Sequence, residues 1–488
     1  MFLTAALTIG GAVLLGLAAR SDEKNPIQIL GGLGLVGLAG FMHLTGPAPL
    51  LQSVGYASAE LGAGMLVVAG MLAGRKDEAR NFFFIGAGAM AIGVALIVAR
   101  SMFSPTVSLL VELGPDDTYD EIADVVAEHQ GVAERAFPMV DMTESEDLAQ
   151  VYLIRLPEKC REALRRILDM DSENVDNVEL NTAFGLDLPE SEELSADALA
   201  DVLENDPLVG SQWGLDAIRG HQAHALLENS SPVRKASIAI VDTGVDSGHE
   251  DMDGIFETSP GSSDQHGHGT HCAGIAAAAT NNGLGVASLN WEGKFVTIRS
   301  YSALGDNGMG TLESISEALI EAAEAGADVI SMSLGGQSPI TPKTIVDAVA
   351  YARKQGAVII VAAGNSNVDA SNNVPSNVEG VIAVGAVNER LDKAPFSNTT
   401  QRLSRPISAP GTNILSLKPT GGYVKLSGTS MATPMVAGLV GVMRSLNPEL
   451  GADEIYDILK STGRSTSASK SVGVMIDAEK AIQAAMNG

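Results

Sequence analysis

The sequence predicts three structural regions in a row: a membrane region of four helices, a small α+β domain, and a larger α/β domain with a largely parallel sheet. Three observations lead to this division. The first hundred of the 488 residues are mostly apolar and carry few charges, whereas the rest is acidic. Alternating apolar residues begin at Val107, as expected for a half-buried strand. Beyond residue 210, strand-like apolar runs alternate with helical ones, which is typical of a parallel sheet flanked by helices.

Residues 1–103 contain four apolar runs, and each is near the ~20 residues that a helix needs to cross about 30 Å of hydrocarbon. Basic residues lie between the first two runs and between the last two, so these loops are expected in the cytoplasm. The remainder of the chain is then extracytoplasmic. A cleaved signal peptide is the alternative for the first run, but this run lacks a basic start and further apolar runs follow it. The four spans are expected at about residues 2–19, 27–43, 54–74 and 82–99.

Residues 104–189 are expected to form a small ferredoxin-like sandwich with the element order βαββαβ. One helix is predicted over Ile122, Val125 and Val126, after a capping box of Thr118 and Glu121, and another over 158–168. This kind of fold does not by itself specify a function. Residues 190–208 are acidic and rich in Ala, Leu and Ser, so they are predicted as a linker. Residues 209–488 would form the α/β domain. The four strands of the small domain are expected near residues 107–113, 132–140, 149–156 and 175–180.

Charge and cysteine content exclude some classes of partner and architecture. The formal net charge of −28, from 59 acidic and 31 basic residues, argues against nucleic acid as a partner. The two cysteines, Cys160 and Cys272, fall in different predicted domains, so a disulfide framework is not needed.

Three segments of the α/β domain carry residues that suit acyl transfer. Asp242 ends a buried strand and is followed by a turn glycine, His268 opens an Ala-rich helix, and Ser430 follows Gly428 at the start of an apolar helix. Each segment alone is ambiguous, because a carboxylate after a strand is also found in nucleotide and metal sites. Close histidines could hold zinc, but His268 and His271 lack the metalloprotease spacing with a nearby glutamate.

Together, the three segments occur in the order Asp, His, Ser, and this resembles the subtilase family from about Gln212 to Ala485. The resemblance implies a subtilisin-like fold and a serine endopeptidase in which Ser430 is the nucleophile, His268 the general base and Asp242 its orienting carboxylate. It also implies that the side chain of Asn365 and the Ser430 N–H stabilise the oxyanion. A small domain directly before such a protease resembles an inhibitory prodomain, whose C-terminal tail occupies the cleft.

The resemblance further implies that a polypeptide substrate binds as an added β-strand. His266 and His271 are expected to support the site, and Cys272 is expected to be a buried small side chain. No cofactor is expected. Many subtilases hold calcium in a long loop after the catalytic histidine helix, but here Thr280–Gly285 is short and Asp251 alone is no calcium site. The metal prediction is therefore none, with structural calcium left open. Substrate is expected between two segments, Ser333, Leu334 and Gly335 on one side and Gly308, Met309 and Gly310 on the other.

The sequence therefore predicts a membrane-anchored serine endopeptidase that is made as a self-processing zymogen. Its expected partners are polypeptide substrates, its own prodomain and the membrane. Two alternatives stay open: a binding or scaffold protein on an inactive protease fold, and a membrane sensor or transport component with an accessory protease. A Ser430→Ala replacement separates the protease from both alternatives, because a scaffold role or a transport role would survive the loss of the catalytic serine.

Overall fold

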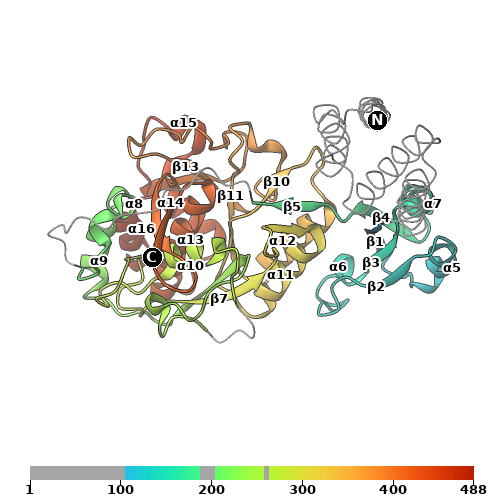
Figure 1. Ribbon diagram of the computed structural model, residues 1–488, viewed down its shortest axis with the longest axis horizontal. Coiled ribbons are helices and arrows are strands. Elements are labelled where there is room, and N and C mark those ends of the chain that lie inside the picture. Colours follow the sequence, from blue (N-terminus) through green and yellow to red (C-terminus); the bar gives the residue numbers. More distant parts are fainter. Residues whose placement is uncertain (1–104, 187–203, 258–262, 488) are drawn as a thin grey trace, which may run out of the picture. The chain divides into compact units, whose positions relative to one another are not determined.

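The computed structural model describes residues 105–186, 204–257 and 263–487 (Figure 1). The four predicted membrane spans and most of the predicted acidic linker lie outside these ranges. Within the described ranges, no helix is both long and apolar enough to cross a membrane. The chain divides into two compact units, and the second, Val107–Leu156 with Cys160–Gly488, contains the features described below.

Residues 105–186 form a four-stranded sheet with strand order β2-β3-β1-β4. Two helices, α5 (Asp120–Glu128) and α7 (Glu158–Met170), follow the first and third strands, so the element order is βαββαβ as predicted from the sequence. The β1–β4 and β2–β3 pairs are antiparallel. Apolar residues of the strands and both helices form one buried cluster, which gives this region a core of its own. The strands are β1 (Thr106–Leu113), β2 (Val132–Arg135), β3 (Val151–Pro157) and β4 (Val175–Leu180).

The second strand ends at Arg135 and is therefore shorter than the predicted 132–140. Pro138 has no N–H to give to a ladder, which is why a strand does not continue through it. Phe137 and Val140 instead turn inward and are buried. The sequence analysis did not predict the short helix α6 (Glu146–Ala149), which begins where the Ser145 side chain accepts a hydrogen bond from the Leu148 N–H.

The larger domain is built on a seven-stranded sheet with order β17-β14-β13-β11-β9-β6-β7. Its strand pairs are parallel. All seven residues of β6 are buried, as expected for a strand covered on both faces. The chain passes from β6 to β7 and then returns to β9 on the other side of β6, which creates a switch in strand order where polar side chains can gather. The strands are β6 (Ala236–Asp242), β7 (Val296–Ser302), β9 (Val329–Met332), β11 (Val358–Ala362), β13 (Ile382–Val387), β14 (Pro406–Pro410) and β17 (Val474–Met475).

Helices cover both faces of this sheet. Alternate β6 residues point to opposite faces, so Ile238 and Ile240 join the core under α10 and α13, while Ala239 and Val241 join the core under α11 and α12. The pair α11 and α12 pack against each other (Figure 1). The helices are α8 (Trp213–Ala217), α9 (Gly220–Leu227), α10 (His268–Ala277), α11 (Leu312–Glu324), α12 (Lys343–Lys354), α13 (Thr429–Leu446), α14 (Ala452–Thr462), α15 (Ser469–Val472) and α16 (Ala478–Asn487).

Three short antiparallel pairs complete the domain. One is the hairpin of β15 (Ile414–Leu417) and β16 (Tyr423–Leu426). Another joins β10 (Gly336–Gln337) to β12 (Asn373–Val374). The third joins β5 (Ala183–Gly185), at the end of the small domain, to β8 (Met309–Thr311). This last pair links the two domains through backbone hydrogen bonds.

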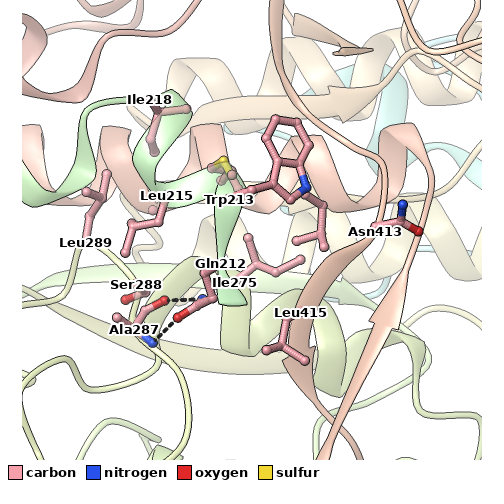
Figure 2. A pocket seen from close by; sticks show the side chains of 14 residues that line it. Gln212, Trp213, Leu215, Ile218, Ile275, Ala287, Ser288, Leu289, Asn413 and Leu415 are labelled. Carbon is pink, nitrogen blue, oxygen red and sulfur yellow. Dashed lines mark hydrogen bonds between the residues drawn. The ribbon is translucent and has the colours of Figure 1, made fainter. Parts of the chain in front are cut away.

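Among the described residues, Glu204 and those after it pack with the larger domain, and the sequence analysis assigned residues up to 208 to the linker. Glu204 and Asp206 are buried. The Asp206 carboxylate accepts hydrogen bonds from the backbone N–H groups of the loop at 281 and 282. Further on, the Gln212 amide makes two hydrogen bonds with the backbone of Ala287 at the edge of a small, mostly apolar pocket (Figure 2). The end of the predicted linker is therefore packed against the larger domain, with Asp206 bound to backbone N–H groups and Glu204 bound to two histidines of α9.

Candidate active site

Asp242 and His268 meet because each stands at the end of a regular element. Asp242 is the last residue of β6 and His268 is the first residue of α10. The His268 Nδ1 lies 2.7 Å from the Asp242 Oδ1, and the same oxygen accepts from the Thr243 N–H at 2.8 Å. Both side chains are fully buried. A carboxylate can only accept, so Nδ1 carries the hydrogen and Nε2 is left as the basic nitrogen.

Gly269 permits this close approach of α10 to the end of β6. A β-carbon at Gly269 would lie 2.0 Å from the Gly244 carbonyl oxygen and 3.1 Å from the Asp242 β-carbon. The first distance is far below van der Waals contact, so no larger residue fits without moving the helix or the turn. The glycine after His268 is thus a packing requirement of the Asp242–His268 pair.

The environment of His268 favours its charged form. Burial alone would lower the pKa of His268, but the Asp242 carboxylate outweighs this effect and holds the pKa well above its usual value. A general base must become an imidazolium during the reaction, and Asp242 stabilises that state. The Nε2 atom is buried and has no hydrogen-bond partner among the described residues.

Three other residues of this segment lie around His268, and of these Cys272 is buried as predicted. Burial lowers the pKa of His271 to about 3, so this side chain is neutral, and its Nε2 lies 3.0 Å from the Val424 carbonyl of the β15–β16 hairpin. Burial raises the pKa of Cys272, which is a fully buried part of the core. The His266 ring lies edge-on to the His268 ring at 6.3 Å between centroids.

Ser430 is the second residue of α13 and lies beside the same cluster. The Cys272 sulfur lies 4.0 Å from the His268 Nδ1 and 3.4 Å from the Ser430 carbonyl oxygen, so it touches both residues. The Ser430 hydroxyl donates to the Ser333 carbonyl at 3.1 Å, at the end of β9. In this structure the hydroxyl is therefore turned toward Ser333. To give its proton to the His268 Nε2, the Ser430 side chain must rotate about χ1.

Asn365 lies next to Ser430 and is held in one orientation. Its Oδ1 accepts from the Thr429 N–H at 2.8 Å and from the Thr429 hydroxyl at 2.9 Å. The Asn365 Nδ2 and the Ser430 backbone N both lie 3.5 Å from the position that a β-carbon on Gly428 would occupy. Gly428 has φ +155°, so a side chain there is disfavoured as well. Two nitrogen atoms that carry hydrogens thus lie near one small space, and an oxyanion requires donors placed in this way.

The predicted substrate edges lie on either side of one strand that belongs to this chain. In β5, Phe184 pairs with Gly310 and Gly185 pairs with Met309. Gly185 also bridges to Gly335 on the opposite side. The Leu186 N–H donates to the Gly308 carbonyl at 3.0 Å. The end of this strand opens on a cavity of about 200 Å³, whose lining includes Leu186, Ser333, Leu334, Gly335, Asn365 and Ser430.

Comparisons with known proteins agree with this geometry. Residues 234–475 match the family model described as Subtilase family. Thermitase from Thermoactinomyces vulgaris is 39% identical over 249 residues, which cover 49% of this chain and 85% of thermitase. The chain is a subtilase. Subtilisin BL from Lederbergia lenta is 34% identical over 275 residues, which cover 55% of this subtilase and 97% of that protein. A solved protease from Pseudoalteromonas arctica PAMC 21717 is 30% identical, has a TM-score of 0.52, and covers 58% of this chain and 99% of its own.

Family membership confirms two predictions from the sequence. The α/β domain has the subtilisin-like fold with a large parallel sheet, and the protein is a serine endopeptidase, a class whose substrates are polypeptides. Subtilases need no cofactor for catalysis, and structural calcium stays open for this chain. The Asp251 carboxylate accepts hydrogen bonds from the Asn282 side chain and the Val286 N–H, each at 2.9 Å, so it binds the loop that follows α10.

Three groups of side chains in the described ranges have the composition of a metal site. One is the Asp242–His268–Cys272 cluster, whose contacts are already explained by the hydrogen bonds above. In the second, the carboxylates of Glu112, Asp147 and Asp347 surround the ammonium of Lys343. The third consists of Glu204, His221 and His224, at the start of the larger domain.

Sequence reasoning missed Thr429 at this site and Glu179 on the small domain. Thr429, which orients Asn365, stands inside the Gly-Thr-Ser segment, so its position next to Ser430 was a usable signal. Glu179 gave no local signal. Its carboxylate caps the start of α12, where it accepts from the backbone N–H of Lys343 and from both the N–H and hydroxyl of Thr344. That contact joins residues more than 160 positions apart, so no short motif could reveal it.

Proposed function

We propose that this subtilase is a membrane-anchored endopeptidase made as a self-processing zymogen, with Asp242, His268 and Ser430 as its catalytic triad. The observation that carries the proposal is the position of β5. This strand lies between the two edges predicted to hold substrate and leads to the cavity beside Ser430. The chain thus presents its own backbone where a substrate backbone is expected.

The chemistry follows from the roles that the geometry allows. The Ser430 oxygen attacks the peptide carbonyl carbon while the His268 Nε2 takes the hydroxyl proton. The resulting oxyanion accepts hydrogen bonds from the Asn365 Nδ2 and the Ser430 N–H. The C–N bond then breaks as His268 returns the proton to the leaving amine, which leaves an acyl ester on Ser430. Water attacks this ester by the same route, and Asp242 stabilises the imidazolium in both halves.

Residues 104–189 act in this proposal as an inhibitory prodomain. Three contacts support the role: β5 in the cleft, the Glu179 cap on α12, and the 2.9 Å hydrogen bond between the Lys343 ammonium and the buried Glu112. A carboxylate at a helix start is favoured by the free N–H groups and the helix dipole. The processing cut is expected in or just before the acidic linker, most of which lies outside the described residues.

The proposed location rests on the sequence. Four apolar runs within residues 1–103 anchor the protein, and the basic loops between them place the protease on the extracytoplasmic side. Its substrates there are polypeptides, and the net charge of −28 argues against nucleic acid.

The test compares the full chain with its Ser430→Ala variant in membranes, by blot and intact-mass spectrometry. Ser427→Ala is the matched control, because this serine is three residues away and bonds only to the neighbouring loop at Asn413 among its described contacts. We expect a cut between about Phe184 and Gln212 in the wild type and in Ser427→Ala, but not in Ser430→Ala. If all three stay full length and a general protein substrate also survives, an inactive scaffold explains the chain better.

Accessibility to added protease tests the anchor separately. In sealed right-side-out vesicles, the catalytic domain of Ser430→Ala should be digested while the loops near residues 20–24 and 75–80 stay protected. Protection of the catalytic domain would reverse the proposed orientation and leave the protease assignment intact.

A further inference from the structure

Helix α9 and Glu204 form a compact cluster away from the triad contacts described above. His221 and His224 are three positions apart, so they lie on one face of α9. Both direct Nδ1 at the same oxygen, Oε1 of Glu204, with His221 at 2.9 Å. The three potential ligand atoms all lie within 4.8 Å of one another.

The hydrogen bonds around His224 show that this cluster needs a positive charge at its centre. The His224 Nε2 lies 2.6 Å from the Ser288 carbonyl oxygen, which can only accept, so Nε2 carries a hydrogen. In the neutral ring Nδ1 then has a lone pair, and this lone pair faces the Glu204 carboxylate. Two electron pairs repel each other unless a proton or a metal ion lies between them.

Only one of the two carboxylate oxygens of Glu204 has a hydrogen-bond partner among the described residues, and this favours a metal ion over a proton. Its Oε1 faces both imidazoles, while its Oε2 is buried and has no hydrogen-bond partner among the described residues. A buried carboxylate oxygen without a partner is costly, and a single proton on one ring leaves it so. A metal ion bound by the carboxylate group would use this charge more fully, because both carboxylate oxygens can bind an ion.

The donor set fits a borderline transition metal. Two imidazoles and one carboxylate are a common set of protein ligands for Zn²⁺, and they leave a fourth position for water. The bond from His224 Nε2 to a backbone carbonyl is the outer contact that usually fixes a metal-binding histidine. The side chains of Glu204 and His224 are fully buried, whereas that of His221 is 21% exposed, so an ion could enter from the His221 side.

We propose that Glu204, His221 and His224 form a binding site for a divalent transition-metal ion of the Zn²⁺ type. The site joins Glu204, which lies in the last part of the predicted linker, to α9, and through His224 to the loop at Ser288. It is separate from the triad, so its role is to hold the beginning of the catalytic domain in place. This part rests on the proposed function: a processing cut before Glu204 would leave the ion at the new end of the mature enzyme.

The test uses the full-length Ser430→Ala chain, which cannot cut itself, after treatment with a chelator. Co²⁺ is the probe, because its visible absorption reports coordination by imidazole and carboxylate, and Zn²⁺ is then added as competitor. We expect one Co²⁺ per chain, displacement by Zn²⁺, and a rise in melting temperature on the order of 5 °C when free metal is about a hundredfold above Kd.

Two ligand variants and two controls locate the ion. Glu204→Gln and His221→Gln should each weaken Co²⁺ binding by more than about a hundredfold, since losing even an outer-shell partner costs ~10–100-fold. His129→Gln, a histidine of the small domain, and Cys272→Ala, in the cluster beside the triad, should bind as the parent does. His221 is partly exposed, so its replacement leaves the fold intact and decides the result if Glu204→Gln fails to fold.

Three outcomes would overturn the proposal. The parent chain could bind no Co²⁺ or Zn²⁺, which would make the cluster an imidazolium–carboxylate group. The His221→Gln variant could bind as the parent does, which would place the ion elsewhere. Loss of binding only in Cys272→Ala would place it at the Asp242–His268–Cys272 cluster.

Discussion

Replacement of Asp242 by asparagine removes one negative charge and leaves the shape of the side chain almost unchanged. Because the Asp242 Oδ1 accepts from both His268 and the Thr243 N–H, an asparagine oxygen in the same place can keep both hydrogen bonds. The amide nitrogen then takes the place of Oδ2, which is buried and has no partner among the described residues. The histidine therefore keeps its tautomer, and the main loss is the charge that stabilises the imidazolium.

The size of that loss follows from the distance between the two groups. At 2.7 Å between the His268 Nδ1 and the carboxylate oxygen, the Coulomb energy at an effective dielectric constant of ~20 is about 6 kcal/mol. Each 1.36 kcal/mol is a factor of ten in rate, so kcat should fall by roughly four orders of magnitude. The pKa of His268 should also fall, because burial lowers it and the Asp242 carboxylate is the largest of the influences that raise it.

The assay is the pH dependence of kcat and kcat/KM on a chromogenic peptide, with Asp246→Asn as the control. Asp246 lies four residues away and accepts only from backbone N–H groups in its described contacts. Wild-type kcat/KM should rise with pH through the raised pKa of His268, because only the neutral ring is a base. In Asp242→Asn this limb should move to lower pH. A fall in kcat of less than tenfold, with no shift of the limb, would refute the assigned role of Asp242.

Three further predictions follow. Asn365→Ala should lower kcat by about 10²–10³-fold, or ~2.7–4 kcal/mol, with little change in KM, and an equal loss in the exposed Asn372→Ala control would contradict this. Gly269→Ala should cost ~1–3 kcal/mol of unfolding free energy because its β-carbon meets a backbone oxygen at 2.0 Å; an unchanged melting temperature would be inconsistent with that contact. Burial raises the pKa of Glu112 from 4.5 to about 7 despite Lys343, so its contribution to prodomain docking is complete below pH 4.5 and is lost as the pH rises through 7. Co-purification of the two processed parts should show this loss in the wild type, and equal pH dependence in Glu112→Gln would exclude Glu112 as its cause.

The parts that sequence reasoning could predict are those with a local pattern. Asp242 and His268 each stand at the boundary of an element that the apolar residues mark, and Ser430 follows a glycine that begins a helix. The two glycine-containing substrate segments were also predicted as a pair, and the structure brings them to either side of β5. The elements of the small domain followed from alternation and helical spacing, except where Pro138 ended β2.

The parts that the sequence could not reveal depend on side chains that meet only after folding. Glu204 is acidic and stands in an acidic segment, so it was assigned to a linker, yet it is buried against two histidines of α9. Glu179 looked like one of many surface carboxylates, yet it caps α12. Neither has a spacing rule, because the partners are fixed by the packing of separate elements and not by distance along the chain.

If substrate takes the place of β5, as proposed, the position of this strand also limits which polypeptides the enzyme can cut. The strand forms backbone contacts on both of its edges, with Gly310 and Met309 on one side and Gly335 on the other. A substrate that takes this place must expose both edges of an extended segment at once. A strand inside a folded sheet already shares its edges with neighbours, and a helix uses its backbone groups internally. The enzyme should therefore open proteins at flexible loops, tails and unfolded stretches, and leave well-folded domains intact.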